Sequence, residues 1–308
     1  MSKISTKWAL SRIARKVCHP KNFFQLLGHM RGHTPTHRSK GDEQLELYSK
    51  ILPGDYLHYG YFEEVPSSPE EISLQDIFNA QDAYAQLLVD QVKRTESRVL
   101  DIGCGLGGLL KLLESRSIEV QGITPDSSQI RYIRSRYPSI PLFEGVFEDY
   151  PIEENIGSYG SIITSESFQY LDFDRCFDSI EKLLEEKGRW ILCDYFKRDG
   201  KASEDSGHLW EDFESKRSRD GWKVILEHDI TDNVLPGLSF AHMWCQRMVF
   251  PLFQYAEKKL QRKRPAAHFV LEELVEEVEN SLQGTFRLLD PETFRKEKRY
   301  ILTVMEHP

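Results

Sequence analysis

From residue 98 onward, short apolar runs alternate with stretches in which apolar residues recur at helical spacing. Runs of four to six apolar residues predict buried strands, and recurrence every three or four positions predicts amphipathic helices. The predicted strands cover residues 98–102, 119–123, 161–164, 190–193, 222–226 and 300–305. The predicted helices cover residues 74–92, 106–115, 127–136 and 175–186, followed by a long, mainly helical stretch over 235–289. Alternating strands and helices predict a doubly wound α/β fold with a largely parallel sheet.

The N-terminal part differs in charge from the rest of the chain. Residues 1–41 contain Lys and Arg but no Asp or Glu, although the whole chain has a formal net charge of -9. Mixed basic and apolar positions over 4–27 predict amphipathic helices, so we expect a basic helical extension over residues 1–47. It would cover the ligand site, touch anionic lipid as a peripheral membrane contact, or serve as a mitochondrial targeting segment. The acidic remainder argues against a nucleic-acid partner.

Cysteine usage and hydropathy restrict the compartment. The 5 cysteines are widely spaced and form no C-x-x-C pair, so we predict neither a metal site nor a disulfide framework. No apolar run approaches the roughly 20 residues that a membrane-spanning helix needs. We therefore expect a cytoplasmic protein, with a peripheral membrane or mitochondrial location as alternatives.

A glycine-rich loop follows the first predicted strand. Gly103, Gly105 and Gly108 satisfy the spacing G-x-G-x-x-G between that strand and the next predicted helix. Such a loop lets a ligand approach the backbone closely, because a side chain there would block it. Several nucleotide-binding folds share this spacing, so the loop alone does not select the ligand.

Asp101 favours one class of ligand. It stands two residues before the first glycine, close to where a dinucleotide would place its pyrophosphate. An unpaired carboxylate would repel those phosphates, whereas S-adenosylmethionine carries an ammonium and a sulfonium and no phosphate. We therefore favour S-adenosylmethionine as the cofactor. The alternatives are that Asp101 only caps the turn, and that the protein is an NAD-dependent oxidoreductase.

Four segments carry a resemblance in combination: HYGYF at 58–62, the glycine loop, GITPDSSQ at 122–129 and SESFQY at 165–170. In this order they resemble the class I S-adenosylmethionine-dependent methyltransferases, in the branch that holds tocopherol-type, sarcosine-type, sugar and cyclopropane-fatty-acid enzymes. The resemblance implies a Rossmann-like, seven-stranded, mostly parallel sheet with an antiparallel last strand. It also implies a methyltransferase domain over 48–308, with a helical cap inserted at about 235–290.

The resemblance also implies which residues bind the cofactor. Thr124 and Gln129 would take the ribose hydroxyls, because the second predicted strand does not end in the acid that many class I enzymes use; Asp126 is the alternative. Phe147 and Glu148 would flank and bind the adenine, although core packing explains Phe147 almost equally well. The implied cofactor-binding residues are Tyr59, Asp101, Gly103, Cys104, Gly105, Gly107, Thr124, Gln129, Phe147, Glu148 and Ser165.

The candidate catalytic residues are His58 and Tyr170, which lie in segments that, by resemblance, face the donor methyl group. A histidine titrates near neutral pH and suits proton removal, but a single histidine in an aromatic loop is more often structural. The phenol of Tyr170 is a weak base and would orient the acceptor instead. Cyclopropane-fatty-acid synthases carry a Glu-His pair where this chain has Gln169 and Tyr170, so ring formation on a lipid is disfavoured.

The inserted helical stretch suggests the acceptor. It contains aromatic and apolar residues at helical spacing, which suit a small apolar or aromatic acceptor molecule but also fit ordinary core packing. These residues are Phe240, Met243, Trp244, Met248, Phe250, Phe253 and Tyr255. We expect direct methyl transfer, for which aligning donor and acceptor supplies most of the acceleration. A non-catalytic S-adenosylmethionine-binding protein is a further alternative, and the sequence does not predict the oligomeric state.

Overall fold

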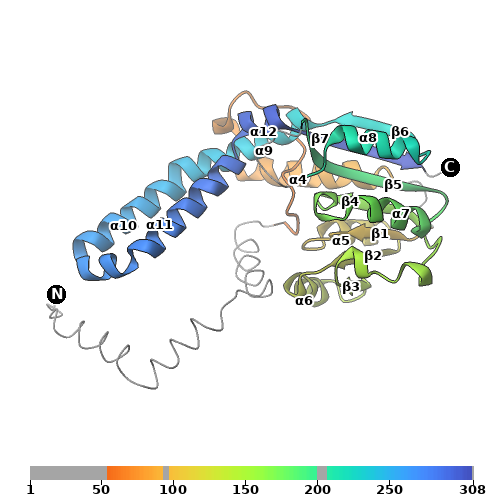
Figure 1. The fold of residues 1–308 in the computed structure, drawn as a ribbon, viewed down its shortest axis with the longest axis horizontal. Coiled ribbons are helices and arrows are strands. Elements are labelled where there is room, and N and C mark those ends of the chain that lie inside the picture. Colours follow the sequence, from red (N-terminus) through yellow and green to blue (C-terminus); the bar gives the residue numbers. More distant parts are fainter. Residues whose placement is uncertain (1–53, 93–96, 200–206, 307–308) are drawn as a thin grey trace, which may run out of the picture. The chain divides into compact units, whose positions relative to one another are not determined.

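Seven strands form one sheet within the part of the chain that the computed structural model describes, residues 54–92, 97–199 and 207–306 (Figure 1). The strands are β1 (Val99–Ile102), β2 (Val120–Thr124), β3 (Leu142–Glu144), β4 (Tyr159–Ser165), β5 (Leu184–Lys197), β6 (Lys223–Asp229) and β7 (Lys298–Glu306). The helices are α4 (Leu74–Val89), α5 (Gly108–Ser115), α6 (Ser127–Arg136), α7 (Phe173–Leu183), α8 (Trp210–Arg219), α9 (Thr231–Trp244), α10 (Phe250–Lys263), α11 (Pro265–Leu288) and α12 (Pro291–Glu297). The basic extension predicted over residues 1–47 lies outside the described residues.

The strand order is β3-β2-β1-β4-β5-β7-β6. Strands β1 to β5 pair in parallel, and β7 is antiparallel to both β5 and β6. The expected mostly parallel sheet with an antiparallel last strand is therefore confirmed. β1 lies between β2 and β4, where the chain order reverses, and open α/β sheets bind ligands outside the carboxyl ends of the strands at such a point.

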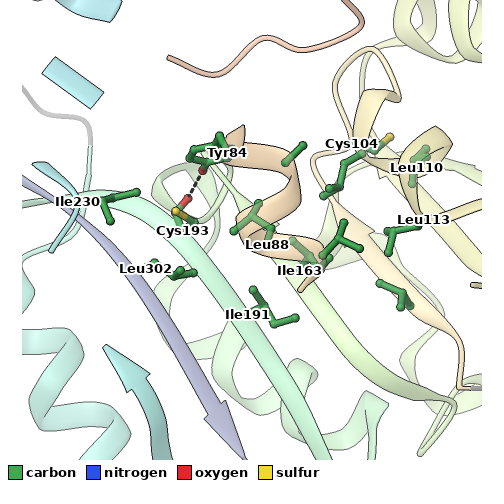
Figure 2. Packing of buried hydrophobic residues seen from close by; sticks show 14 of the residues in the cluster. Tyr84, Leu88, Cys104, Leu110, Leu113, Ile163, Ile191, Cys193, Ile230 and Leu302 are labelled. Carbon is green, nitrogen blue, oxygen red and sulfur yellow. Dashed lines mark hydrogen bonds between the residues drawn. The ribbon is translucent and has the colours of Figure 1, made fainter. Parts of the chain in front are cut away.

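Alternating strand residues face two separate cores, because successive side chains in a strand point to opposite faces. One face packs against α4 and α5, and Figure 2 shows Leu88 of α4 and Leu110 of α5 among strand residues such as Ile163 and Ile191. The other face packs against α7 and α8 through an aromatic cluster centred on the fully buried Trp190. Both faces are covered, which explains why the central strands are apolar without alternation.

The structure differs from the predicted elements in several places, among them α12, which was not predicted. β3 was not predicted, because Leu142–Glu144 is only three residues long and is partly exposed. The helix predicted over 175–186 ends at Leu183, and β5 begins at Leu184. α8 was also missed, since Trp210–Arg219 is mostly charged and buries only three side chains.

The predicted helical stretch over 235–289 is helical. α9 continues through a π-helical turn (Cys245–Val249) into α10, and α11 returns beside α10 (Figure 1). Phe240 of α9 is buried against Phe62 and Ile77, whereas α10 and α11 contain no buried residue along their described lengths. The role of the whole stretch as a cap stays a prediction. No helix among the described residues is long and apolar enough to cross a membrane.

Candidate functional site

The glycine loop turns sharply at the carboxyl end of β1. Gly103, Gly105 and Gly107 have φ angles of 86°, 54° and 85°, which glycine adopts without strain. A Cβ on Gly103 would lie 2.4 Å from Cβ of Ser167, whose hydroxyl donates to the carbonyl of Ile102 at 2.5 Å. The loop is thus fixed against the segment after β4, and Gly103 is required by both conformation and space.

Asp101 is buried at the centre of this edge. Its side chain is only 2% exposed, and its strand register places it beside Gly122 of β2 and Ile163 of β4. No hydrogen bond found among the described residues involves its carboxyl group. Burial raises the pKa of Asp101 to about 7. A buried carboxyl group without a protein partner fits a site for a cationic ligand group.

The end of β2 supplies polar groups next to the loop. Thr124 donates from its hydroxyl to Oε1 of Gln129 at 2.6 Å, so the two predicted ribose-binding residues lie together. Asp126, the alternative, accepts from the backbone N–H of Ser128 at 2.8 Å and caps α6. Its carboxylate is therefore engaged at the helix start, which leaves the amide of Gln129 as the available donor.

The segment over residues 54–62 lies across the glycine loop. The carbonyl of Asp55 accepts from the N–H of Gly108 at 3.0 Å, and the N–H of Tyr59 donates to Glu166 at 3.3 Å. At its far end, the N–H of Phe62 donates to the carbonyl of Asn233 in α9 at 2.9 Å. This segment thus connects the start of α5, the loop after β4 and α9.

Glu166 is part of a network that sequence reasoning did not identify. It follows β4 with a positive φ of 50°, which is unusual for a residue other than glycine. Its carboxylate accepts from the hydroxyl of Tyr300 at 2.6 Å, and Tyr300 lies 3.0 Å from the hydroxyl of Tyr84. Tyr84 is also 3.0 Å from the hydroxyl of Ser165. Burial raises the pKa of Glu166 to about 7, while the bonds from Tyr300 and Tyr59 oppose that rise.

Asp194 is a second acid that the sequence did not reveal. It lies in β5, is fully buried, and accepts from the N–H of Gln169 at 3.2 Å and of Tyr195 at 2.8 Å. Burial, followed by the nearby charge of Glu166, raises the pKa of Asp194 to about 8. Little in the sequence indicated that Asp194 belongs to the site, because an acidic residue after an apolar run looks the same as one that merely ends a strand.

The two candidate catalytic residues occupy different environments. The ring of His58 stacks on Tyr84 with centroids 4.1 Å apart, and its Nδ1 is buried without a partner among the described residues. Burial lowers the pKa of His58 to about 3, which makes the imidazole a weak base. Tyr170 is 75% exposed, and burial of its hydroxyl end, with the charges of Asp194 and Glu166, raises its pKa.

The remaining predicted residues are distributed over the same edge. Phe147 is 3% exposed and packs in the core with Tyr150, as the core-packing alternative expects. Glu148 accepts from the N–H of Asp172 at 3.0 Å. Cys104 is buried in the loop, and burial raises the pKa of its thiol. Among the described residues, no cluster of His, Cys, Asp and Glu has the arrangement of a metal site.

Residues 99–188 match a family described as a methyltransferase domain. An uncharacterized methyltransferase of Alkaliphilus oremlandii is 25% identical over 122 residues, which cover 38% of this chain and 55% of the relative. The glycine/sarcosine/dimethylglycine N-methyltransferase of Actinopolyspora halophila is 23% identical over 187 residues, covering 58% of this chain and 31% of that protein. The chain therefore spans about half the length of the first of these relatives, and less of the second.

Solved structures share the fold. The geranyl diphosphate C-methyltransferase of Streptomyces coelicolor has a TM-score of 0.61 at 16% identity, covering 82% of this chain and 88% of that one. The [4+2]-cyclase SpnF has a TM-score of 0.63 at 17% identity, covering 88% and 94% of the two chains. The strand order, the glycine loop and the domain match together define a Rossmann-like methyltransferase fold. Residues 99–188 are therefore similar to methyltransferase domains, and these findings support the resemblance of the chain to the class I S-adenosylmethionine-dependent methyltransferases.

Proposed function

We propose that this protein transfers a methyl group from S-adenosylmethionine to a small, apolar or aromatic acceptor. The observation that carries the proposal is Asp101, a buried carboxyl group beside the glycine loop for which no hydrogen-bond partner is found among the described residues. It suits the ammonium group of S-adenosylmethionine, and it would repel the pyrophosphate of a dinucleotide at the same place.

The other residues of this edge fit the remainder of the cofactor. The amide of Gln129, oriented by Thr124, suits the ribose hydroxyls, and the backbone of Gly103 and Gly105 permits close approach. When bound, S-adenosylmethionine supplies a methyl group on a sulfonium that is already activated for transfer. The protein then has to align the acceptor and exclude water, which the segment over 54–62 is positioned to do.

Some methyl acceptors lose a proton during the transfer. Of Glu166 and His58, Glu166 is better suited to take up that proton. Its raised pKa of about 7 suits proton exchange at neutral pH, whereas the lowered pKa of His58 does not. Oε1 of Glu166 already accepts from the hydroxyl of Tyr300 and the N–H of Tyr59, so the proton would be taken up on Oε2. We assign His58 a packing role against Tyr84, and Tyr170 a role at the exposed rim where the acceptor enters.

The acceptor class rests on the aromatic side chains around the segment over 54–62. Tyr56, Tyr59 and Tyr61 are partly buried there, and Tyr170 is exposed nearby in sequence to Glu166. Aromatic walls with a few polar groups are typical of sites for small apolar molecules. The solved relative that acts on geranyl diphosphate has an acceptor with an apolar chain, which agrees with this proposal.

Calorimetry with S-adenosylmethionine and with NAD tests the cofactor. We expect binding of S-adenosylmethionine only, and binding of NAD alone would contradict the proposal. Mass spectrometry of small-molecule extracts incubated with the protein and a labelled methyl donor then tests the reaction. Donor binding without any labelled product would favour a non-methylating role, as for the cyclase with the same fold.

A further inference from the structure

Helices α10 and α11 form an arm (residues 250–288) that extends from the sheet domain (Figure 1). The helices run antiparallel, since Phe250 contacts Phe286 near the base, with ring centroids 5.2 Å apart, and His268 lies 3.6 Å from Glu257 near the tip. No residue of the arm is buried. A pair of helices whose side chains are at most partly buried gains less stability from packing than core helices do, which favours a further surface against them.

The arm exposes large apolar side chains at helical spacing. On α11, Val270, Leu274 and Val278 follow one another at intervals of four residues and are 75%, 54% and 40% exposed. On α10, Leu252 and Tyr255 are about equally exposed, at 60% and 61%. Such a contiguous apolar stripe is unusual on the surface of a monomer and marks an interaction surface.

Charges on the arm are separated along its length. The basic segment, residues 258–271, contains Lys258, Lys259, Arg262, Lys263 and Arg264 and no acid. The acidic segment, residues 272–279, contains Glu272, Glu273, Glu276, Glu277 and Glu279 and no base. None of the ion pairs found among the described residues involves any of these ten side chains. The ion pairs found there thus do not join the basic segment to the acidic segment of the same arm.

We propose that the arm is a dimerisation element, in which the arms of two copies pack antiparallel into a four-helix bundle. Antiparallel packing brings the basic segment of one copy beside the acidic segment of the other, twice, as a two-fold axis requires. The axis then passes near Phe269 and Val270, which lie between the last basic side chain, Arg264, and the first acidic one, Glu272, and are the most exposed apolar residues of the arm. A parallel arrangement would instead place like charges together.

The length of the arm is sufficient for an interface with a second copy of the chain. A stable dimer buries roughly 800 Å² on each partner, from about 20–30 residues. α10 and α11 contain 14 and 24 residues, so the two helices together are long enough to supply such an interface. An anionic membrane fits less well, because the acidic segment would be repelled from it.

Light scattering on the full chain at micromolar concentration tests the proposal, and we expect a dimer. The double variant Val270→Ser/Leu274→Ser should raise the dimer dissociation constant roughly tenfold or more. The two serines would bury less apolar surface in the dimer interface than the native Val and Leu. The control Ile156→Ser, at a residue 57% exposed on the sheet domain, should leave the constant unchanged. A wild-type monomer, or equal dissociation constants for both variants, would overturn the proposal.

Charge reversal tests the antiparallel arrangement. One variant carries Glu272, Glu273, Glu276 and Glu277 replaced by Lys, and a second carries Lys258, Lys259, Arg262 and Lys263 replaced by Glu. Each alone should be monomeric, whereas an equimolar mixture should form heterodimers that weaken with salt. Recovery in the mixture also shows that both arms are folded. Homodimers of either variant, or a mixture that stays monomeric, would refute the arrangement.

Discussion

The hydroxyl of Tyr300 in β7 donates a hydrogen bond of 2.6 Å to Oε1 of Glu166, the residue that follows β4. The two residues are 134 positions apart in the sequence. This bond ties the antiparallel last strand to the loop that also holds the N–H of Tyr59. The position of the segment over 54–62 therefore depends on a residue in the last strand of the sheet.

Replacing Tyr300 by Phe should destabilise the fold and change Glu166. The variant loses the bond to Glu166 and the contact with the hydroxyl of Tyr84, so the free energy of unfolding should fall by about 1–3 kcal/mol. The pKa of Glu166 should rise further, because the bond from Tyr300 lowers it. Urea unfolding measures the loss, and Tyr170→Phe, at a 75% exposed position outside the arm, is the matched control with an expected change within about 0.5 kcal/mol.

The stability of the ligand-free protein should fall as pH rises from about 5 to 8. Asp101, Glu166 and Asp194 have native pKa values of about 7, 7 and 8, well above the values near 4 in an unfolded chain. Between those values the native state binds more protons than the unfolded state. Their stabilising contribution is therefore complete below about pH 4 and is lost as pH rises through 7 to 8.

The variant Asp194→Asn isolates one of these groups. Its free energy of unfolding should depend less steeply on pH than that of the wild type, and the two should differ most above pH 8. Urea denaturation at pH 5 and at pH 8.5 measures both slopes. Parallel slopes for the variant and the wild type would show that Asp194 ionises as freely in the native state as in the unfolded chain.

His58 should stay uncharged over the physiological range. Burial lowers its pKa to about 3, and its ring stacks on Tyr84. In NMR spectra, the imidazole resonances of His58 should not shift between pH 5 and 8 in the native protein. In urea, the same resonances should titrate near pH 6.5. Native titration near pH 6.5 would restore His58 as a candidate base.

Gly103→Ala should destabilise the protein even without ligand. The positive φ of 86° costs a residue with a side chain roughly 1–3 kcal/mol, and the new Cβ would collide with Ser167 at 2.4 Å. Gly284→Ala is the opposite case, because Gly284 lies in α11 with nothing within 4 Å of an added Cβ. That change should stabilise the protein by about 0.5–1 kcal/mol. Thermal unfolding compares the two variants, and equal shifts would contradict the strained loop.

The sequence predicted the elements that carry a strong local pattern. β1, β2, β4 and β5 contain buried apolar runs, and each prediction overlaps the observed strand. The three-residue β3 has no such run. It forms a strand because it pairs with β2, and not because of a pattern in its own residues. Tertiary packing decides such elements, and a single sequence does not contain that information in local form.

In the candidate site, too, the outcome depends on how far apart in the sequence the contacting residues lie. The contact between Thr124 and Gln129 joins residues five positions apart in one of the segments that carry the family resemblance, and that resemblance assigned both residues to the ribose. The contacts of Tyr84 with Ser165 and with Tyr300 join residues 81 and 216 positions apart. Such contacts exist only after the sheet has formed, so the network around Glu166 could not be predicted from periodicity or spacing.

Asp101→Asn should weaken S-adenosylmethionine binding while leaving the fold intact. The carboxyl group is buried where we propose that the ammonium of the ligand arrives, and it has no partner among the described protein groups. Losing a charge-assisted hydrogen bond should cost about 1.5–3 kcal/mol, or roughly tenfold to a hundredfold in affinity. Calorimetric titration measures this loss. The free energy of unfolding should not fall, because Asn has the same shape and needs no buried charge.

Adenosine is the decisive control for this variant, because it lacks the amino-acid part of S-adenosylmethionine. If Asp101 binds the ammonium, adenosine should bind wild type and variant alike. A general collapse of the pocket would weaken both ligands equally, so equal losses would disprove the proposed ligand orientation. The affinity of the wild type for S-adenosylmethionine should also rise as pH increases through about 7, where Asp101 ionises, and the variant should lack this dependence. A pH dependence that persists in the variant would assign the titrating group elsewhere.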